Sequence, residues 1–478
     1  MEQNELYYFY VKPTKVNVTD LANQIGEKDY VVATTIECLI HQQNWVNKRR
    51  GNTSKHENAY ANVSDKTLRN AHWRAPYAIR KLKDSGVLFC DDIYVVGEKA
   101  LGYKFNHNLF DGTFDFWTVD INSVHHNAAT SIQEYKSNSQ VQVSETTQSL
   151  SKHIEDLNMS RDVLNDSRLS DTDLKPITDT LNGSRRFKQT GTANRIYSTV
   201  TSLPKYARSY ISSNNYSDFS EVDLSCSQPF LFAGFVNSLI KARQTPHNHT
   251  EKCSTILSQG NSITTPEHIQ SWVSGLSETE FENLKEELEE FIQLVTVQDI
   301  YMDAKDKLQP AYKNTLTRDN MKTKVLMLMN ESHENLNSDI YEKDGQVYDN
   351  RLKYLETSYQ SSFPVLWSIL RKIRAFAKAR FDTSAGDILN RLESHVMIGC
   401  ATEISENTPY PVMTIHDCIM VPSEVASIVN QKVKNAFQSL FGIQPKTTVE
   451  RLERQQPKNK VYSYEQKSNK PTGHSVHA

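Results

Sequence analysis

Two aspartates, each beside an apolar run, have the side chains needed to bind metal ions. Asp223 ends an expected strand in SEVDLSCSQPFLFAGF (220–235), just before an apolar helix. Asp417 follows His416 in TPYPVMTIHDCIMVPSE (408–424), where two apolar runs indicate a hairpin with the acid at its tip. Phosphoryl transfer needs an aligned nucleophile and neutralised charge, which two metal ions about 3.5–4 Å apart supply when carboxylates bridge them. One aspartate from each of two neighbouring strands meets that minimum, with Mg²⁺ or Mn²⁺ as the expected pair of ions.

A basic helix is expected between the two acidic segments. In AYKNTLTRDNMKTKVLMLMN (311–330), Arg318, Lys322 and Val325 recur three or four residues apart and would share one helical face. The two cations would bind the β- and γ-phosphates of a nucleoside triphosphate, with the apolar end of the helix beside the base. The same spacing also fits an ordinary solvated amphipathic surface.

In order and spacing, these segments resemble motifs A, B and C of family A DNA polymerases and of bacteriophage-type single-subunit RNA polymerases. Motif A is matched by Asp223, motif B by Arg318 with Lys322, and motif C by the His-Asp pair. Upstream, TGTANRIYSTVTSLPKYAR (190–208) resembles the segment of that superfamily that contacts the primer–template duplex. The resemblance extends over about residues 186–450, a little more than half of the chain.

The resemblance implies an α+β right-hand polymerase whose two aspartates bind the metal ions. His416 would support the primer end, and Lys322 would bind the triphosphate and protonate the pyrophosphate leaving group. Arg195 and Tyr197 match the duplex-contacting segment, and Arg195 would hold the duplex backbone. The expected partners are a primer–template and nucleoside triphosphates.

Three positions depart from the family pattern. Gln228 stands where the DNA polymerases have the glutamate that helps to exclude ribose, and Asn330-Glu331 replaces the usual Tyr-Gly. Motif C reads HDC, as in some RNA polymerases, where DNA polymerases read HDE. The amide of Asn330 could hydrogen-bond a 2′-hydroxyl. Whether the product and template are DNA or RNA therefore stays open, as do primer requirement and processivity.

The residues before these motifs predict a nucleic-acid-binding module. From Ser64 the pattern indicates a short helix, a turn, a second helix ending near Gly86, and then strand-like VLFC, IYVV and YKF segments. This order is typical of a winged helix-turn-helix. Cations of the second helix would face DNA: Arg74, Arg80, Lys81 and Lys83. The alternative is a small packing domain with Trp73, Tyr77 and Leu82 in its core.

The expected domains are a winged-helix module at 1–107, a thumb-like or linker region at 108–185, palm and fingers at 186–452, and a disordered tail at 453–478. In LRKIRAFAKAR, Arg371 and Arg374 belong to a run of cations without an acid, which suits a phosphate backbone. Such a run also suits a surface helix with snorkelling side chains.

Composition sets the remaining expectations. The chain of 478 residues carries a net charge of -3, which argues against a uniformly basic nucleic-acid coat. Its six cysteines are scattered without zinc-ligand spacing, and neither a signal peptide nor a membrane span is expected. We expect a cytoplasmic monomer without membrane contact, from a phage or mobile element. The rival hypothesis, motivated by Gln228 and Asn330, is an inactive polymerase-fold replication initiator or regulator that binds DNA through the winged helix.

Overall fold

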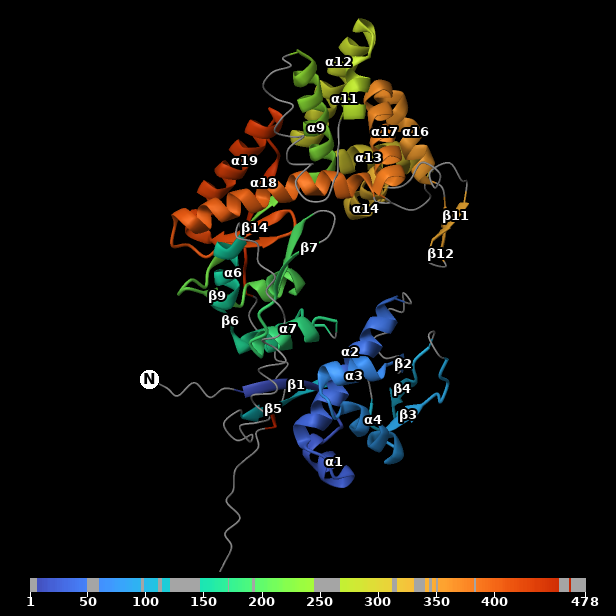
Figure 1. The fold of residues 1–478 in the computed structure, drawn as a ribbon, viewed down its shortest axis with the longest axis vertical. Coiled ribbons are helices and arrows are strands. Elements are labelled where there is room, and N and C mark those ends of the chain that lie inside the picture. Colours follow the sequence, from blue (N-terminus) through green and yellow to red (C-terminus); the bar gives the residue numbers. More distant parts are fainter. Residues whose placement is uncertain are drawn as a thin grey trace, which may run out of the picture.

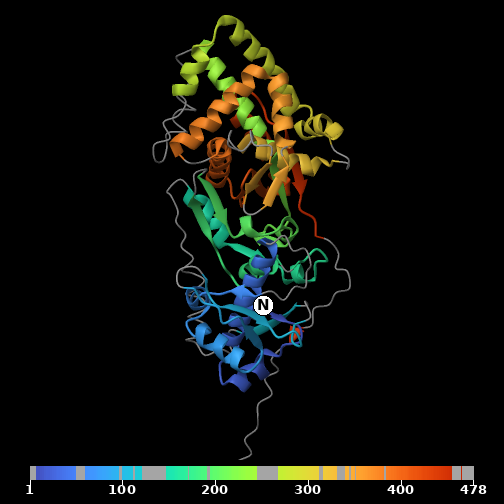
Figure 2. The same cartoon turned by 90° about the vertical axis from the view of Figure 1, so that its right-hand side faces the viewer.

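The protein is an elongated α+β molecule with its N-terminal unit at one end and a group of helices at the other (Figures 1 and 2). A small sheet lies between the two. The computed structural model describes residues 7–49, 60–95, 99–110, 114–120, 147–170, 172–190, 194–244, 267–311, 316–330, 340–343, 346–349, 351–381, 384–454 and 464–465.

The sheet between the two ends has the strand order β13-β14-β10-β15, and all its neighbours are antiparallel. Its strands are β13 (Met413–Ile415), β14 (Cys418–Pro422), β10 (Phe219–Leu224) and β15 (Thr447–Arg451). Both β13 and β14 are buried along their whole length. The two acidic segments of the sequence therefore lie side by side in one sheet, although they are far apart in the chain.

Three helices pack around this sheet: α9 (Ser227–Gln244), α18 (Ala385–Asn407) and α19 (Ala426–Phe441). The ring centroid of Phe230 on α9 lies 5.5 Å from that of Phe437 and 6.3 Å from that of Phe441 on α19. A Cβ atom at Gly234 would lie 2.7 Å from the Phe441 ring, so α9 and α19 approach closely only because position 234 is glycine. This dense packing holds β10 rigidly.

The far end of the molecule consists mainly of helices. Their core stacks Tyr359 on Trp367 with 5.2 Å between ring centroids, and Phe291 packs edge-on against Phe363. The elements are α11 (Glu267–Ser274), α12 (Glu278–Thr296), α13 (Ile300–Leu308), α14 (Arg318–Asn330), β11 (Ile340–Lys343), β12 (Gln346–Asp349), α16 (Arg351–Ser362) and α17 (Pro364–Phe381).

The N-terminal unit follows the predicted order closely. Its elements are α1 (Val18–Ile25), α2 (Asp29–Arg49), β2 (Ala61–Asn62), α3 (Asp65–Ala71), α4 (Ala75–Asp84), β3 (Leu88–Cys90) and β4 (Gly102–Phe105). The strands form a sheet in the order β2-β4-β3. The strand predicted at IYVV is not found over its described residues, 93–95, where Val95 forms only an isolated bridge with Lys99; Val96 lies outside the described residues.

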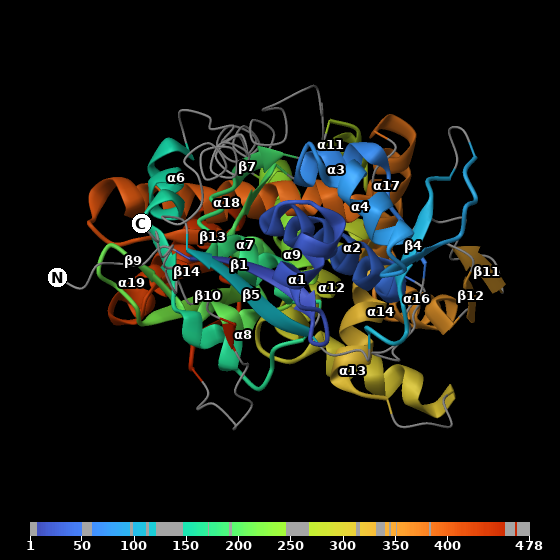
Figure 3. The ribbon, with the colours of Figure 1, turned by 90° about the horizontal axis from the view of Figure 1, so that it is seen from below.

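The N-terminal unit extends beyond the expected boundary at residue 107. Strand β1 (Tyr7–Pro13) pairs with β5 (Phe114–Asp120), as Figure 3 shows from below. In the segment expected to be a disordered tail, β16 (Tyr464–Glu465) pairs in parallel with β5.

Several short elements connect the N-terminal unit to the sheet that carries the acids. Asn182, after α7 (Leu174–Leu181), exchanges two hydrogen bonds with the backbone of Phe9 on β1. His153 on α6 (Gln148–Glu155) hydrogen-bonds Ser405 on α18. The other elements here are β6 (Leu157–Met159), β7 (Phe187–Thr190), β8 (Arg195–Ser198), α8 (Lys205–Arg208) and β9 (Ile211–Ser213).

Within the described part of the chain, no helix combines the length and apolarity needed to cross a membrane. Its five cysteines carry free thiols; Cys253 lies outside the described residues.

Candidate active site

The two predicted aspartates lie beside each other on neighbouring strands. Asp223 on β10 is paired with Cys418 on β14, and the next residue along, Leu224, donates its backbone N–H to the Asp417 carbonyl at 3.3 Å. Both aspartates are partly buried. The sheet register therefore brings together two carboxylates from residues that are almost 200 positions apart.

The backbone turns beside both acids contain residues in the left-handed region. His416, the first residue of the two-residue hairpin that ends with Asp417, has φ 54°, as primed hairpin turns require. Cys226, between β10 and α9, has φ 55°. Such conformations are uncommon outside glycine and cluster at functional sites.

The electrostatics of Asp223 are those of an acid without full compensation. Burial raises the pKa of Asp223 to about 7; the carboxylates of Asp417 and Glu221 act in the same direction, while Lys322 and Lys205 oppose them. A raised carboxyl pKa means that the anionic form is costly in this position. A bound cation would remove that cost.

The donor set fits hard divalent cations. Among the described residues, no three His, Cys, Asp or Glu side chains are grouped closely enough to hold a metal ion by themselves. Two carboxylates alone are nevertheless a suitable protein contribution for Mg²⁺, which keeps several waters and takes further oxygens from substrate phosphates. Asp223 and Asp417, with the Leu224 carbonyl, are the residues that would hold such ions.

Helix α14 places one cation toward the acids and ties the other to a neighbouring helix. Lys322 is exposed, lowers the pKa of Asp223, and forms no ion pair with any residue that the structure describes. Arg318 donates Nε–H to Asp299 at 2.7 Å and lies over the Tyr301 ring. Val325 follows at the predicted spacing along α14 and is 1% exposed, so its side chain packs in the core.

Asp299 was missed in the sequence. Its side chain caps α13 by accepting from the Tyr301 backbone N–H, and the same carboxylate holds Arg318. The capping pattern at the start of a helix would have identified the cap but not its second role, which depends on how α13 packs against α14.

A buried acid on α18 also joins the site. Glu393 is fully buried and accepts a hydrogen bond from Arg195 on β8. Burial raises the pKa of Glu393 to about 7, Arg195 lowers it, and Asp417 raises it further. Arg195 is thus held within the site by an acid that no sequence pattern indicated, because Glu393 lies in the middle of an ordinary helix.

His416 and Tyr197 meet beside Arg195. Their ring centroids are 5.8 Å apart in an edge-on arrangement. Burial lowers the pKa of His416, and Arg195 acts in the same direction while Asp417 opposes it. The structure therefore brings the motif C histidine together with both residues of the predicted duplex-contacting segment.

A third missed acid, Glu221, lies on β10 itself. Glu221 is 4% exposed and pairs with Arg208 at 2.7 Å and with Lys205 at 3.6 Å. Because side chains alternate along a strand, Glu221 and Asp223 share one face of β10. That period of two was visible in the sequence and could have identified it.

Gln228 and Asn330, predicted separately as sugar-selecting residues, contact each other. Asn330 Nδ2 donates to Gln228 Oε1 at 2.8 Å and to the Leu326 carbonyl at 2.7 Å. Both amide hydrogens of Asn330 are therefore used, so a hydrogen bond between Asn330 and a 2′-hydroxyl would have to use Oδ1 as the acceptor. A Cβ atom at Gly386 would lie 1.6 Å from Asn330 Oδ1, so α18 approaches the pair only through a glycine.

The predicted phosphate-binding cations of α17 lie elsewhere. Arg374 is 2% exposed and donates to Glu356 at 3.0 Å and to the Leu328 carbonyl. The prediction was wrong for Arg374, because a fully buried guanidinium cannot reach a nucleic-acid backbone. Arg371 donates to the same carboxylate at 3.1 Å.

The predicted cations of α4 are mostly engaged within the N-terminal unit. Arg74 pairs with Glu27 at 2.8 Å, and Lys81 donates to the Ile25 carbonyl at 2.7 Å at the end of α1. Arg80 is exposed, although its Nε–H donates to the Pro76 carbonyl. The aromatic residues suggested for the core of the alternative packing domain are exposed: Trp73 at 68% and Tyr77 at 49%, whereas Leu82 is buried.

No protein-family model and no curated protein match the chain. Among solved structures, it is similar to the POL domain of Pol1 from M. smegmatis in complex with DNA primer-template and dNTP. The match has 11% sequence identity and a TM-score of 0.30, and it covers 93% of this chain and 66% of that chain. At this level the likeness decides nothing about the site.

Proposed function

We propose that this protein is a template-directed nucleic-acid polymerase that uses two-metal phosphoryl transfer. The supporting observation is the pair of partly buried aspartates on neighbouring strands, with the pKa of Asp223 raised to about 7 and the exposed cation of Lys322 nearby. We assign the sheet and its helices, within 186–452, to a palm and the helices from α11 to α17 to fingers. The short elements of 147–185 would be a linker.

The roles of the side chains follow from their positions. Asp223 and Asp417 would hold the ions, which when bound would supply neutralisation of the phosphate charge and alignment of the primer hydroxyl. Lys322 would bind the triphosphate and give a proton to the departing pyrophosphate oxygen. His416, steadied by Tyr197 and Arg195, would support the primer end.

The pair formed by Gln228 and Asn330 would act at the sugar as one unit. Gln228 Oε1 accepts from Asn330, and Gln228 Nε2 donates to Asn390 Oδ1 at 3.3 Å. The second amide hydrogen of Gln228 would therefore be the group of the pair that reaches the sugar. Whether this arrangement favours ribose or deoxyribose decides between RNA and DNA as product.

We further propose that the N-terminal unit is a winged helix that binds nucleic acid in the cytoplasm of a phage-infected or element-bearing cell. The helix α2, strand β2, helices α3 and α4 and the β3–β4 hairpin, with the sheet order β2-β4-β3, support this assignment. Arg80 is the exposed cation of α4.

Extension of a primed template in the presence of Mg²⁺ tests the proposal, with separate pools of dNTPs and NTPs. We expect incorporation from at least one pool, and its loss in Asp223→Asn and in Asp417→Asn. Asp218→Asn is the matched control, because Asp218 precedes the same strand but pairs with Arg451 outside the site. A chain that shifts DNA in a gel yet adds no nucleotide would instead be the inactive initiator or regulator.

A further inference from the structure

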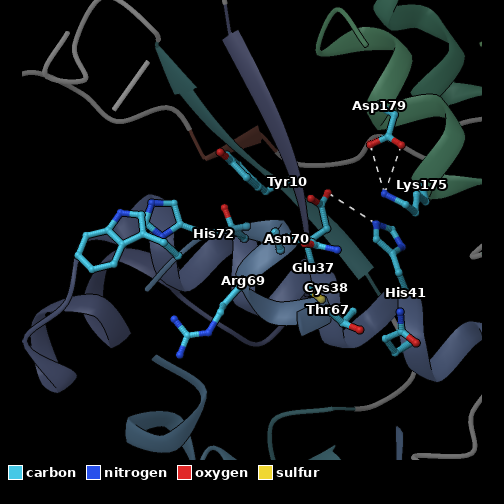
Figure 4. A pocket seen from close by; sticks show the side chains of 14 residues that line it. Tyr10, Glu37, Cys38, His41, Thr67, Arg69, Asn70, His72, Lys175 and Asp179 are labelled. Carbon is cyan, nitrogen blue, oxygen red and sulfur yellow. Dashed lines mark hydrogen bonds and ion pairs between the residues drawn. The ribbon is translucent and has the colours of Figure 1, made fainter. Parts of the chain in front are cut away.

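A cavity outside the candidate active site separates the N-terminal unit from α7. It has a volume of about 390 Å³ and is lined by residues of β1, α2, α3 and α7. His72 lies on one side of it, and Lys175 with Asp179 lies on the opposite side (Figure 4). Small-molecule sites typically have volumes of about 300–1,000 Å³, so this cavity has the size of a ligand site.

The rim of the cavity carries an exposed aromatic platform. Trp73 lines the cavity and is 68% exposed, and its ring centroid lies 5.9 Å from that of His72. The guanidinium of Arg74 lies over the same indole at 5.4 Å. An exposed indole beside a cation is an arrangement on which nucleobases stack.

The wall of the cavity offers hydrogen-bonding groups that have no partner among the residues described in the structure. The side-chain amides of Gln42 and Asn70 line the cavity and bond no residue that the structure describes. His41 Nε2 is buried and also lacks a hydrogen-bond partner among these residues; the nearest carboxylate oxygen, of Glu37, is 3.9 Å away. Of these groups only His41 Nε2 is buried, and a buried polar atom is ordinarily satisfied, so it points to a polar ligand. Asn70 is exposed and Gln42 is half-buried, so a ligand in the cavity can reach both amides.

The charges around the cavity largely cancel. Lys175 pairs with Asp179 at 3.2 Å, and Arg69 pairs with Asp65 at 3.8 Å. Burial lowers the pKa of His41 to about 3, so its ring is neutral and offers one donor and one acceptor. A neutral polar ring fits this interior better than a triphosphate does.

We propose that this cavity binds a single nucleotide unit, with the base stacked on Trp73 and its polar edge toward Asn70, Gln42 and His41. The ligand is either a base of a single strand or a free mononucleotide, since both present the same ring and edge. Because α7 contributes to the wall, an occupied cavity contacts both the N-terminal unit and the segment that connects it to the palm. The site does not depend on the proposed polymerase activity.

Trp73 fluorescence in the full chain tests the proposal. The probes are an oligothymidylate of about 12 nucleotides, a duplex of the same length, and dTMP. We expect saturable quenching by the oligothymidylate or by dTMP. We expect no quenching in Trp73→Phe, which keeps a ring at this position and leaves the emission of the other four tryptophans. Saturable quenching by dTMP would identify the ligand as a free nucleotide. Saturable quenching by the oligothymidylate but not by dTMP would identify it as a base of a single strand.

Asn70→Ala and Gln42→Ala keep the fluorophore and remove an edge contact. Each should weaken binding at least about fivefold, the effect of one lost hydrogen bond, while Ile428→Ala, which alters an equally exposed residue on α19, should not. Asp223→Asn should leave the quenching unchanged, which separates this site from the polymerase site. Quenching by duplex alone, by none of the probes, or with full affinity in both amide variants would overturn the proposal.

Discussion

Two basic helices of the molecule, α14 and α17, carry cations at similar helical spacing but use them differently. On α14, Lys322 is exposed and its charge reaches Asp223. On α17, Arg371 and Arg374 both bond to one buried carboxylate, Glu356 of α16. Whether a cation faces a ligand or the core depends on whether a neighbouring element places a carboxylate beside it. The local sequence does not show this.

The two helices are also connected. Arg374 donates to the Leu328 carbonyl in the last turn of α14, two residues before Asn330. The buried cation of α17 therefore holds the end of the helix whose exposed cation faces the acids. We infer that changes in α17 act through the stability and position of α14, whereas changes in Lys322 act on chemistry.

Arg374→Ala should have the largest effect on stability. Both members of the Arg374–Glu356 pair are buried, at 2% and 3% exposure, and removing one partner leaves an uncompensated charge at a cost of about 3–5 kcal/mol. Urea unfolding followed by circular dichroism measures this loss. The double change Arg374→Met with Glu356→Gln should recover much of it, and Arg371→Ala, at a site near the surface, should cost far less. Equal losses of unfolding free energy in Arg374→Ala and Arg371→Ala would contradict the distinction between a buried and a near-surface arginine.

Lys322→Ala should reduce turnover by about 100- to 1,000-fold, because one charge-assisted contact to a transferring phosphate contributes about 2.7–4 kcal/mol to the transition state. Its unfolding free energy should not change, because the side chain is exposed and unpaired among the described residues. Single-turnover nucleotide addition gives the rate. Lys324→Ala is the control on the same helix, and a larger loss of turnover there than at Lys322 would reverse the assignment.

The sequence indicated the two candidate metal-binding acids but not the acids that hold the surrounding arginines in place. Asp223, Asp417 and Lys322 were identifiable because each lies in a short segment with its own pattern: a strand end, a hairpin tip and a helix. The supporting acids form ion pairs with arginines that lie between 15 and about 200 residues away in the chain: Glu393, Asp299 and Glu356. The period of two along β10 would have indicated Glu221, but nothing local indicates an ion pair between separate elements.

The N-terminal unit repeats this lesson. Its helices and its β3–β4 strands were predictable because caps and apolar spacing are local, as with Ser64, which caps α3. Its boundary was not, since β1 pairs with β5 more than 100 residues later. Similarly, the spacing of the cations in α17 could not predict whether Arg374 is buried or exposed.

Gln228→Ala and Asn330→Ala should each change the ratio of dNTP to NTP incorporation by about fivefold, the effect of losing one hydrogen bond of roughly 1 kcal/mol. Because Asn330 donates directly to Gln228, the double variant should show little more than either single change. Single-nucleotide incorporation with both sugars gives the ratio. Additive effects would mean that the two residues act independently at the sugar, and unchanged ratios would place the sugar elsewhere.

The last prediction concerns whether Asp223, unlike Glu356, lacks full compensation. Its pKa is about 7 in the folded chain against 3.8 ordinarily, so between these values the folded form holds a proton that the unfolded form has lost. Stability therefore falls as pH rises through this window, and Asp223→Asn should remove that loss. Its melting temperature should exceed that of the unchanged chain at roughly pH 8 and approach it at roughly pH 4.

Asp218→Asn is the control and should behave oppositely. Arg451 lowers the pKa of Asp218, so the stabilisation that this pair provides is present at neutral pH and lost in acid. Thermal unfolding without divalent cations separates the two. A lower stability of Asp223→Asn at roughly pH 8 would contradict this prediction. It would mean that Lys322 and Lys205 already compensate the charge of Asp223, as the arginines of α17 compensate that of Glu356.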